Sequence, residues 1–509
     1  MKLLFPTSFT LISLLTGGCA IHPTAATAPQ ISGFVASIQK AAADTQVSAD
    51  AVIDVNEAIG RAIAYNQDIR AEEYGIALTR AQMLAQSSDM LPSVIADSNY
   101  YARNSSALSR SSTSNVTSYS SDPTGIGKDI TLTWNILDFG LSYIRAQQAG
   151  DKAMIQMEQR RKVVTQIIEE TRVTFWRAKS LQNLMKRMNE LKGQVQQQLD
   201  LAEAQSRSSA LDPAAALSYE RDLLAVQREI ESLQQSLVGA NEQLRQLINA
   251  PPGQELHLSA KLEALDETLL RMNGEAAIKT ALQHRYEIRQ ALYETRITEK
   301  EVMAELLQLL PGISTNLGSL TDTNSFLTNP NWIAWGAKAS WNLLEVFKFP
   351  VKRDSIAAQQ QVNQAKAMAM AIAISTQVSV ARTRYAIQMH AYKSARQFAS
   401  VQRRLTVQTG IAAKFGRVGE QSMVREQMSD LLAQTKLDFA YADLQNAYAS
   451  YVSALGFDDL DYGHMSNLPP EQITGFLKQT QSEGKQSISK LTAPIFVGCG
   501  AKLKCEPKS

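Results

Sequence analysis

Hydrophobic and polar residues follow two periods along this chain, a period of two in short stretches and a helical period in long ones. The stretch TLTWNILDFG begins at Thr131 and continues the alternation that starts one residue earlier. Ile130, Leu132, Trp134 and Ile136 share one face, and the residues that alternate with them, Thr131, Thr133 and Asn135, are polar. This alternation predicts a strand with one apolar face and one wet face.

A second strand of the same kind occurs later in the chain and leads into KASWNLLEVF. Trp335 and Trp341 fall on its apolar face, whereas Lys338 falls on the opposite face and is expected to point into a wet interior. Each copy provides two strands of about ten to twelve residues, enough to cross an outer membrane when tilted. Bacterial membrane barrels need about eight strands, so we expect four strands per chain to be completed by further copies of the chain.

The strands are followed by long helical stretches. From about Leu141 to Arg207 there is no proline, and a helix of about 66 residues would span about 100 Å. The next helix carries a heptad seam with steps of three and four, which predicts coiled-coil packing. The seam consists of Leu223, Val226, Ile230, Leu233, Leu237, Ala240, Leu244 and Leu247. Two shorter helices, about 40 and 36 residues long, would together match the long helix, which predicts a rod with the strands at one end.

The pattern occurs twice. EAIGRAIAYNQDIR, from Glu57, aligns with EAAIKTALQHRYEIR, from Glu275, and the Leu91-Pro92 step recurs at Leu310-Pro311. This is the signature of an internal repeat. The predicted divisions are a signal peptide with a lipobox-like end (1–19), an N-terminal linker (20–49), a first repeat (50–250), an inter-repeat linker (251–271), a second repeat (272–460) and a C-terminal tail (461–509).

The N-terminus has the features of an export signal. Lys2 precedes an apolar run from Leu3 to Leu15, and small residues lead to Cys19. Small residues directly before a cysteine resemble the lipobox of bacterial lipoproteins, so Cys19 is the expected lipidation site, although Thr16 stands where Leu is usual. The alternative is an ordinary signal peptide with an incidental cysteine. Past Cys19 the segment is expected to be a flexible tether.

Composition gives no sign of a nucleic-acid partner, since 51 basic residues nearly balance 49 acidic ones. Cys499 and Cys505 lie close together in the tail and could form a disulfide in an oxidising compartment. The five histidines have no metal-ligand spacing, and no catalytic motif occurs. We therefore expect no enzyme activity, no cofactor and no metal.

The order of these features resembles the TolC-like outer-membrane channel family, the outer-membrane factors of tripartite efflux pumps and type I secretion systems. The resemblance covers about Asp50 to Leu460. Its markers are the EAIGRAIAYNQDIR opening, the Leu-Pro step, the TWNILDFG corner and KFGRVGEQSMV at the second helix turn, in this order and doubled.

The resemblance implies a mainly α fold in which antiparallel coiled-coil helices form an α-barrel and four strands per chain complete a 12-stranded β-barrel in a homotrimer. It implies an outer-membrane channel reaching into the periplasm, with a periplasmic adaptor (membrane fusion) protein and an inner-membrane transporter as partners. The loops at about 102–128 and 319–331 would face the cell exterior. The residues implied at the periplasmic entrance are Leu211, Asp212, Val418, Gly419, Glu420, Arg425 and Met428.

Gly419 suits a tight turn that needs a positive φ. Some family members carry aspartates just beyond this turn, where this chain has Arg425 and Met428. Our hypothesis is that Arg425, repeated threefold, makes the entrance anion-tolerant. The alternative is a solvated arginine paired with Glu426 or Asp430.

A different function remains open, an exported coiled-coil scaffold or periplasmic adaptor that forms no pore. The heptads alone would permit it. The apolar strand face, with Trp134, Trp335 and Trp341, favours the channel, because an adaptor has no need of it. The sequence does not identify the cargo, nor does it separate efflux from protein secretion.

Overall fold

The computed structural model describes residues 25–44, 46, 52–110, 113, 116–207, 213–251, 253, 256–259, 267–456 and 468–479. Cys19, Leu211, Asp212, Cys499 and Cys505 lie outside the described residues. The first repeat contains β1 (Val52–Ile53), α2 (Val55–Tyr65), α3 (Gln67–Ser88), β2 (Ser93–Ala102), β3 (Ala107–Arg110), β4 (Thr117–Ser121), β5 (Thr124–Asn135), α4 (Ile136–Arg207) and α5 (Pro213–Ile248). The second contains α6 (Gly274–His284), α7 (Tyr286–Gln308), β7 (Gly312–Asp322), β8 (Asn331–Ser340), α8 (Leu343–Lys414) and α9 (Glu420–Leu455).

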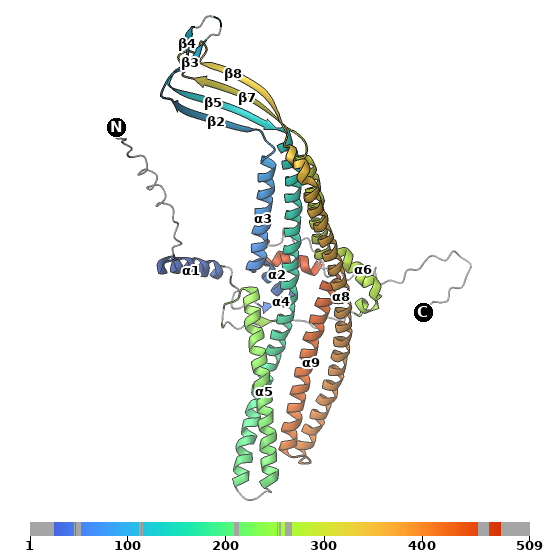
Figure 1. Cartoon of the computed structure of the whole chain (residues 1–509). Coiled ribbons are helices and arrows are strands. Elements are labelled where there is room, and N and C mark those ends of the chain that lie inside the picture. Colours follow the sequence, from blue (N-terminus) through green and yellow to red (C-terminus); the bar gives the residue numbers. More distant parts are fainter. Residues whose placement is uncertain are drawn as a thin grey trace, which may run out of the picture.

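The molecule is a rod built on two long helices, with the sheet at one end and the adjoining ends of α4 and α5 and of α8 and α9 at the other (Figure 1). α4 and α8 each contain 72 residues, which corresponds to about 108 Å. α3 and α5 lie one beyond the other along α4, as the sequence predicted. The helix of about 40 residues, expected between about Asp50 and Leu91, is in fact two helices, because Asn66 caps α3 by accepting hydrogen bonds from the backbone of Asp68 and Ile69.

The helices form a single curved layer with a defined lateral order. Above the middle of the rod the order is α3, α4, α7, α8, and below it the order is α5, α4, α9, α8. α8 therefore forms one edge of the layer over its whole length, and α3 and α5 together form the other edge.

The four-stranded sheet has the order β2-β5-β7-β8, and all neighbouring strands are antiparallel. β2 and β8 are its two edges. The prediction that residues 102–128 form a loop is wrong in part, because this segment contains the β3–β4 hairpin and the first residues of β5. Ser and Thr predominate here, and Thr in particular is compatible with strands despite its polarity.

A collar surrounds the rod at mid-height. The two-residue strand β1 pairs in parallel with β6 (His257–Leu258), and α2, η1 (Thr268–Arg271) and α6 pack beside this pair. Residues 470–479 form a further helix whose Ile473 and Leu477 are buried in the same core. Gly60 on α2 admits this helix, since a Cβ there would lie 2.6 Å from Thr474 Oγ1 and 2.9 Å from the carbonyl oxygen of Pro470.

The expected tether at 20–49 contains α1 (Ala28–Ala43), so that prediction is wrong for these residues. A capping box between Thr27 and Gln30 starts the helix, and the alanines that follow favour it. All sixteen residues of α1 are exposed in the single chain.

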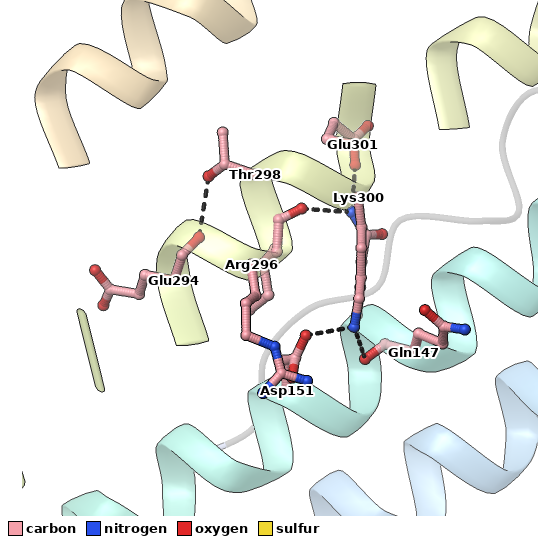
Figure 2. Close-up of polar contacts among 9 residues, drawn as sticks. Gln147, Asp151, Glu294, Arg296, Thr298, Lys300 and Glu301 are labelled. Carbon is pink, nitrogen blue, oxygen red and sulfur yellow. Dashed lines mark hydrogen bonds and ion pairs between the residues drawn. The ribbon is translucent and has the colours of Figure 1, made fainter. Parts of the chain in front are cut away.

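A buried carboxylate joins the two repeats in the upper half of the rod (Figure 2). Asp151 on α4 is 3% exposed and lies 2.9 Å from the guanidinium of Arg296 and 2.6 Å from Lys300 Nζ, both on α7. Beside it, Gln148 Nε2 donates to the carbonyl of Ile297 and to Glu301. Because a buried charge must be paired, this cluster fixes α7 against α4.

Candidate functional site

The sheet exposes its apolar face and encloses its polar face. In β5 the even-numbered residues from Ile126 to Trp134 are exposed, whereas the odd-numbered residues from Gly125 to Asn135 are buried or half-buried. Ile130, Leu132 and Trp134 therefore lie on the outer side of the curved sheet. This is the reverse of a strand in a soluble domain, where the apolar face is covered.

The apolar face continues across all four strands. The strand register places Val94, Leu132, Leu317 and Trp335 directly opposite one another in one row. Their exposed fractions are 64%, 38%, 52% and 84%, respectively. A contiguous row of exposed aliphatic and aromatic side chains marks an interaction surface for a membrane or for another protein.

The opposite face is mainly polar. Lys338 lies opposite Ser314, and Ser314 lies opposite Asn135, so these three residues share the polar face of the sheet. Trp332 and Leu320, which lie opposite Asp129 near the loop end, are apolar exceptions on this face.

Two tryptophans anchor the corners where strands meet helices. Trp134 Nε1 donates to the carbonyl of Met90, and Trp341 Nε1 donates to the carbonyl of Leu309. Each acceptor immediately precedes a Leu-Pro step, so the same contact is made in both repeats. Aligning the two repeats in the sequence pairs Trp134 with Trp341, but it does not show these two hydrogen bonds.

Two residues of the predicted strand face lie just outside the strands. Ile136 is the first residue of α4, and Trp341 follows the end of β8. Both remain exposed, Ile136 at 50% and Trp341 at 56%. They therefore extend the apolar band to the junction with the helices.

The turn between α8 and α9 forms one tip at the far end of the rod. The prediction that Gly419 adopts a positive φ is wrong: Gly419 caps α9 at φ −73°, and Gly416 takes the left-handed conformation at φ 68°. Gly416 follows the last turn of α8, where a left-handed residue ends a helix. Val418 is half-buried, and the backbone of Glu420 begins α9.

Arg425 pairs with neither Glu426 nor Asp430, so the partners named in that alternative are wrong, although its side chain is 67% exposed, as the alternative expected. Its guanidinium lies 2.9 Å from the carboxylate of Asp222 on α5, and it thus joins α9 to the first repeat. Both partners are largely exposed. Met428 is half-buried against an apolar cluster between α4, α5 and α9 that includes Leu184, Val226 and Leu431.

A second apolar seam runs along the free edge of α8. The first seam faces α9, where Tyr385 and Tyr392 contact Tyr448 and Tyr441. The second advances by steps of four and three from Val380 to Leu405, and its exposed apolar members are Val380, Ile387, Phe398, Val401 and Leu405. Its heptad spacing could have been recognised from the sequence.

The opposite edge carries a groove on α5. Its lining includes Leu217, Leu224, Arg221, Arg228 and Glu231. Leu217 and Leu224 are exposed at 59% and 44%. α5, which carries the groove, lies below the collar (Figure 1).

The two strand-connecting loops are tied together at the other end. Asp122 accepts hydrogen bonds from the backbone N–H and the hydroxyl of Ser325, and the buried Asn324 donates to the carbonyl of Ser120. Tyr119 stacks on Phe326. The loops of the two repeats therefore form one unit.

Among the described residues, none of the helices is both long and apolar enough to cross a membrane. Within the same ranges, no three His, Cys, Asp or Glu side chains are grouped to hold a metal ion.

Comparison with known proteins gives matches of structure but not of sequence. No family model and no curated protein matches the chain. The fold is similar to that of CusC, studied for transmembrane channel formation, with 15% identity, a TM-score of 0.61 and coverage of 79% of this chain and 92% of that chain. It is similar to the MtrE outer membrane channel of Neisseria gonorrhoeae, with 15% identity, a TM-score of 0.61 and coverage of 79% and 88%.

The CmeC outer membrane channel of Campylobacter jejuni is also similar, with 11% identity, a TM-score of 0.60 and coverage of 85% of this chain and 89% of that chain. The chain therefore has the fold of TolC-like outer-membrane channels. The predicted fold class, mainly α with long coiled-coil helices and a small sheet, is confirmed.

Proposed function

We propose that this chain is one subunit of a trimeric outer-membrane channel that conducts substrates from a periplasmic adaptor and an inner-membrane pump to the cell exterior. The observation that carries the proposal is the inverted sheet, which presents Val94, Leu132, Leu317 and Trp335 outward and Lys338 inward. A lipid phase outside and water inside would satisfy both faces.

The free edges support closure into a ring. β8 of one copy can pair with β2 of the next, and the alternation of strand directions makes that pairing antiparallel. Three copies would give a 12-stranded barrel without unpaired edges, above the minimum of about eight strands for membrane barrels.

The two edges of the helical layer also support assembly of the chains into a ring. The apolar seam of α8 lies on one edge, and the α5 groove with Leu217 and Leu224 lies on the other. Joining different edges of successive copies is a heterologous contact, which closes when the rotation per subunit divides a full turn.

Charge favours this contact as well. α8 carries eleven Lys or Arg residues and two acidic ones, whereas α5 carries three basic and five acidic residues. Opposite net charges on the two edges favour pairing of α8 with α5 over pairing of α8 with a second α8.

The remaining assignments complete the topology. The joined loops would face the exterior, because they lie at the end of the sheet away from the rod (Figure 1). The α8–α9 tip would form the periplasmic entrance with Arg425. Cys19 would carry a lipid anchor, and intact-mass analysis of the Cys19→Ala protein should then show the loss of acylation.

The test is insertion of the purified protein into a planar lipid bilayer. We expect discrete conductance steps, and native mass spectrometry of the same sample should give the trimer. A monomer that produces no conductance, while retaining its helical circular dichroism, would favour the scaffold or adaptor function instead.

A further inference from the structure

The glycines of the four-stranded sheet all lie on its polar face. The strand register places each of them on the face that Lys338 and Asn135 share, and the apolar face of the same four strands contains none. A glycine weakens a strand, so glycines confined to one face indicate that this face needs low side chains. The five are Gly125, Gly127, Gly312, Gly318 and Gly336.

Two of these glycines on β5 are covered by side chains from β2. Tyr101 lies directly opposite Gly125, and Asn99 lies directly opposite Gly127. A Cβ at either glycine would overlap the phenol of Tyr101 or the amide of Asn99. Both side chains therefore lie across β5, along the sheet. The hydroxyl of Tyr101 reaches as far as β7, where it donates to Asp322 at 3.0 Å.

The same arrangement occurs on β7 and β8. Thr131 lies opposite Gly318, and Asn316 lies opposite Gly336. A Cβ at Gly318 would lie 2.8 Å from the hydroxyl oxygen of Thr131, and a Cβ at Gly336 would lie 2.8 Å from the amide oxygen of Asn316. These glycines therefore also make room for a neighbouring side chain close to the wall.

One row of the polar face is built differently, and we call it the Trp332 row. It runs across the four strands through Asp97, Asp129, Leu320 and Trp332, and it contains neither Gly nor Ala. Trp332 is the largest side chain on this face and is 41% exposed. It is the second residue of β8, so the row lies near the loop end of the sheet.

Trp332 also differs from the other aromatic residues near it, because nothing holds its ring against the wall. Tyr101 is fixed by its bond to Asp322, and Trp134 and Trp341 are fixed by bonds from Nε1 to backbone carbonyls. In the part of the chain that the structure describes, Nε1 of Trp332 has no hydrogen-bond partner. Its indole is therefore available to water or to a solute.

The number of strands makes the height of these side chains decisive. About eight strands enclose just enough space for their own side chains, whereas about 16 to 18 strands leave an aqueous channel. The proposed 12-stranded barrel lies between these cases. Its free width at each level therefore depends on how far the side chains of that row stand out from the wall.

We propose that Trp332, present once in each subunit, sets the narrowest level of the pore near its outer exit and sorts departing solutes by size. This inference rests on the proposed function and names the residue that selects at the exit. The rows of Tyr101, Asn99, Thr131 and Asn316 each contain a glycine, and the Trp332 row does not.

The row of Lys338 is the other one without a glycine, but it restricts the pore less. Lys338 lies opposite the small Ser314, and Ser314 lies opposite Asn135. A lysine side chain is flexible and strongly hydrated, so a passing solute can displace it. An indole is rigid and wide, and it can turn about two torsions only.

The Trp332 row is a wet filter rather than a hydrophobic gate. Apolar constrictions close a pore by dewetting. The carboxylates of Asp97 and Asp129 lie in the same row as Trp332, and ionised groups keep their hydration because its loss is costly. The solutes that pass are therefore hydrated molecules below a limiting width.

The experiment measures polymer exclusion by the purified full chain in planar bilayers. Single-channel conductance is recorded in neutral polyethylene glycols of increasing size, because a polymer that enters the pore lowers the conductance and an excluded polymer does not. Trp332→Ala should raise the conductance and shift the limiting polymer to a larger size. Trp332→Phe should give a limit between those of the unmodified protein and Trp332→Ala.

A second variant changes the same level without removing the indole. Leu320→Gly gives Trp332 a glycine opposite it, as Tyr101 and Asn316 have, so the ring can lie along β7 and the limit should again shift to larger polymers. Ile333→Ala is the matched control. Ile333 follows Trp332 in β8 but lies on the apolar face and is 74% exposed, so its loss should leave the limit unchanged.

An unchanged limit in both Trp332→Ala and Leu320→Gly would overturn the inference and leave Trp332 as a cross-strand partner of Leu320 that only stabilises the sheet. An equal shift in Ile333→Ala would also overturn it, because the limit would then follow the stability of the barrel rather than the width of its lumen. Absence of conductance from the unmodified protein rejects the channel itself, so the two failures are distinguishable.

Discussion

α4 and α8 have the same length and the same place in the two repeats, yet they differ in their neighbours and in their charge. α4 has neighbours from its own chain on both sides, α3 and α5 on one and α7 and α9 on the other. α8 has them on one side only, with α6 in the collar. α4 carries eight acidic and twelve basic residues, whereas α8 carries two and eleven.

This difference teaches how a duplicated unit adapts to its position. An inner helix can bury an ion cluster such as that of Asp151, because both partners belong to one chain and fold together. An edge helix must remain soluble until it meets a partner, so it keeps a seam of separated apolar residues flanked by charge. The same repeat thus yields one internal helix and one interaction helix.

The largest effect should come from the inner helix. Asp151→Asn leaves Arg296 and Lys300 without their buried counter-charge, and we expect a loss of about 2–4 kcal/mol in the free energy of unfolding. Urea unfolding followed by circular dichroism measures it.

The control for that change lies on α8. Asp354 is 70% exposed, so Asp354→Asn should alter the free energy of unfolding by less than about 0.5 kcal/mol. Equal losses in both variants would remove the contrast between the two helices.

A substitution on the edge helix α8 should affect the stability of the single subunit less, but it should weaken the trimer clearly. Phe398→Asp places a charge in the α8 seam and removes about 1.5–3 kcal/mol of apolar burial per contact from the proposed ring. The trimer should dissociate in native mass spectrometry while the monomer keeps its helical content. Gln397→Asp, one residue off the seam, should leave the trimer intact; dissociation in both variants would mean that the seam is not the contact.

The smallest effect concerns the ion pair that joins the two repeats at the entrance. A double-mutant cycle of the neutral changes Arg425→Gln and Asp222→Asn should give a coupling energy of about 0.2–1 kcal/mol, because both side chains are exposed. Arg425→Asp alone should shift the reversal potential in a salt gradient towards cations, and the exchanged pair, Arg425→Asp with Asp222→Arg, should restore it. An unshifted reversal potential would place Arg425 away from the ion path.

The elements that depend on local pattern were predictable from the sequence. The heptad seam from Leu223 to Leu247 and the strand face with Leu132 and Trp134 follow from spacing alone, and the repeat located their counterparts. These features were enough to predict the fold, because each repeat contains the same strand-to-helix corner.

What the sequence left open depends on contacts between distant residues or on backbone geometry. The bond between Arg425 and Asp222 joins residues of different repeats, so local spacing favoured Glu426 and Asp430 instead. Gly416 and Gly419 lie in the same turn, and only the backbone angles show which one is left-handed. The helix that covers Gly60 lies in a tail without a recognisable motif.

The helix at residues 470–479 also sets the order in which the molecule can be completed. Thr474 Oγ1 donates to the carbonyl of Asn56 on α2, 418 positions earlier in the chain, so the core of the collar stays open until residues 470–479 have been made and have docked. Contacts of such long range form late and slowly. A chain truncated before Ile473 would expose apolar surface around Gly60, and proteases could therefore distinguish unfinished copies from finished ones before assembly.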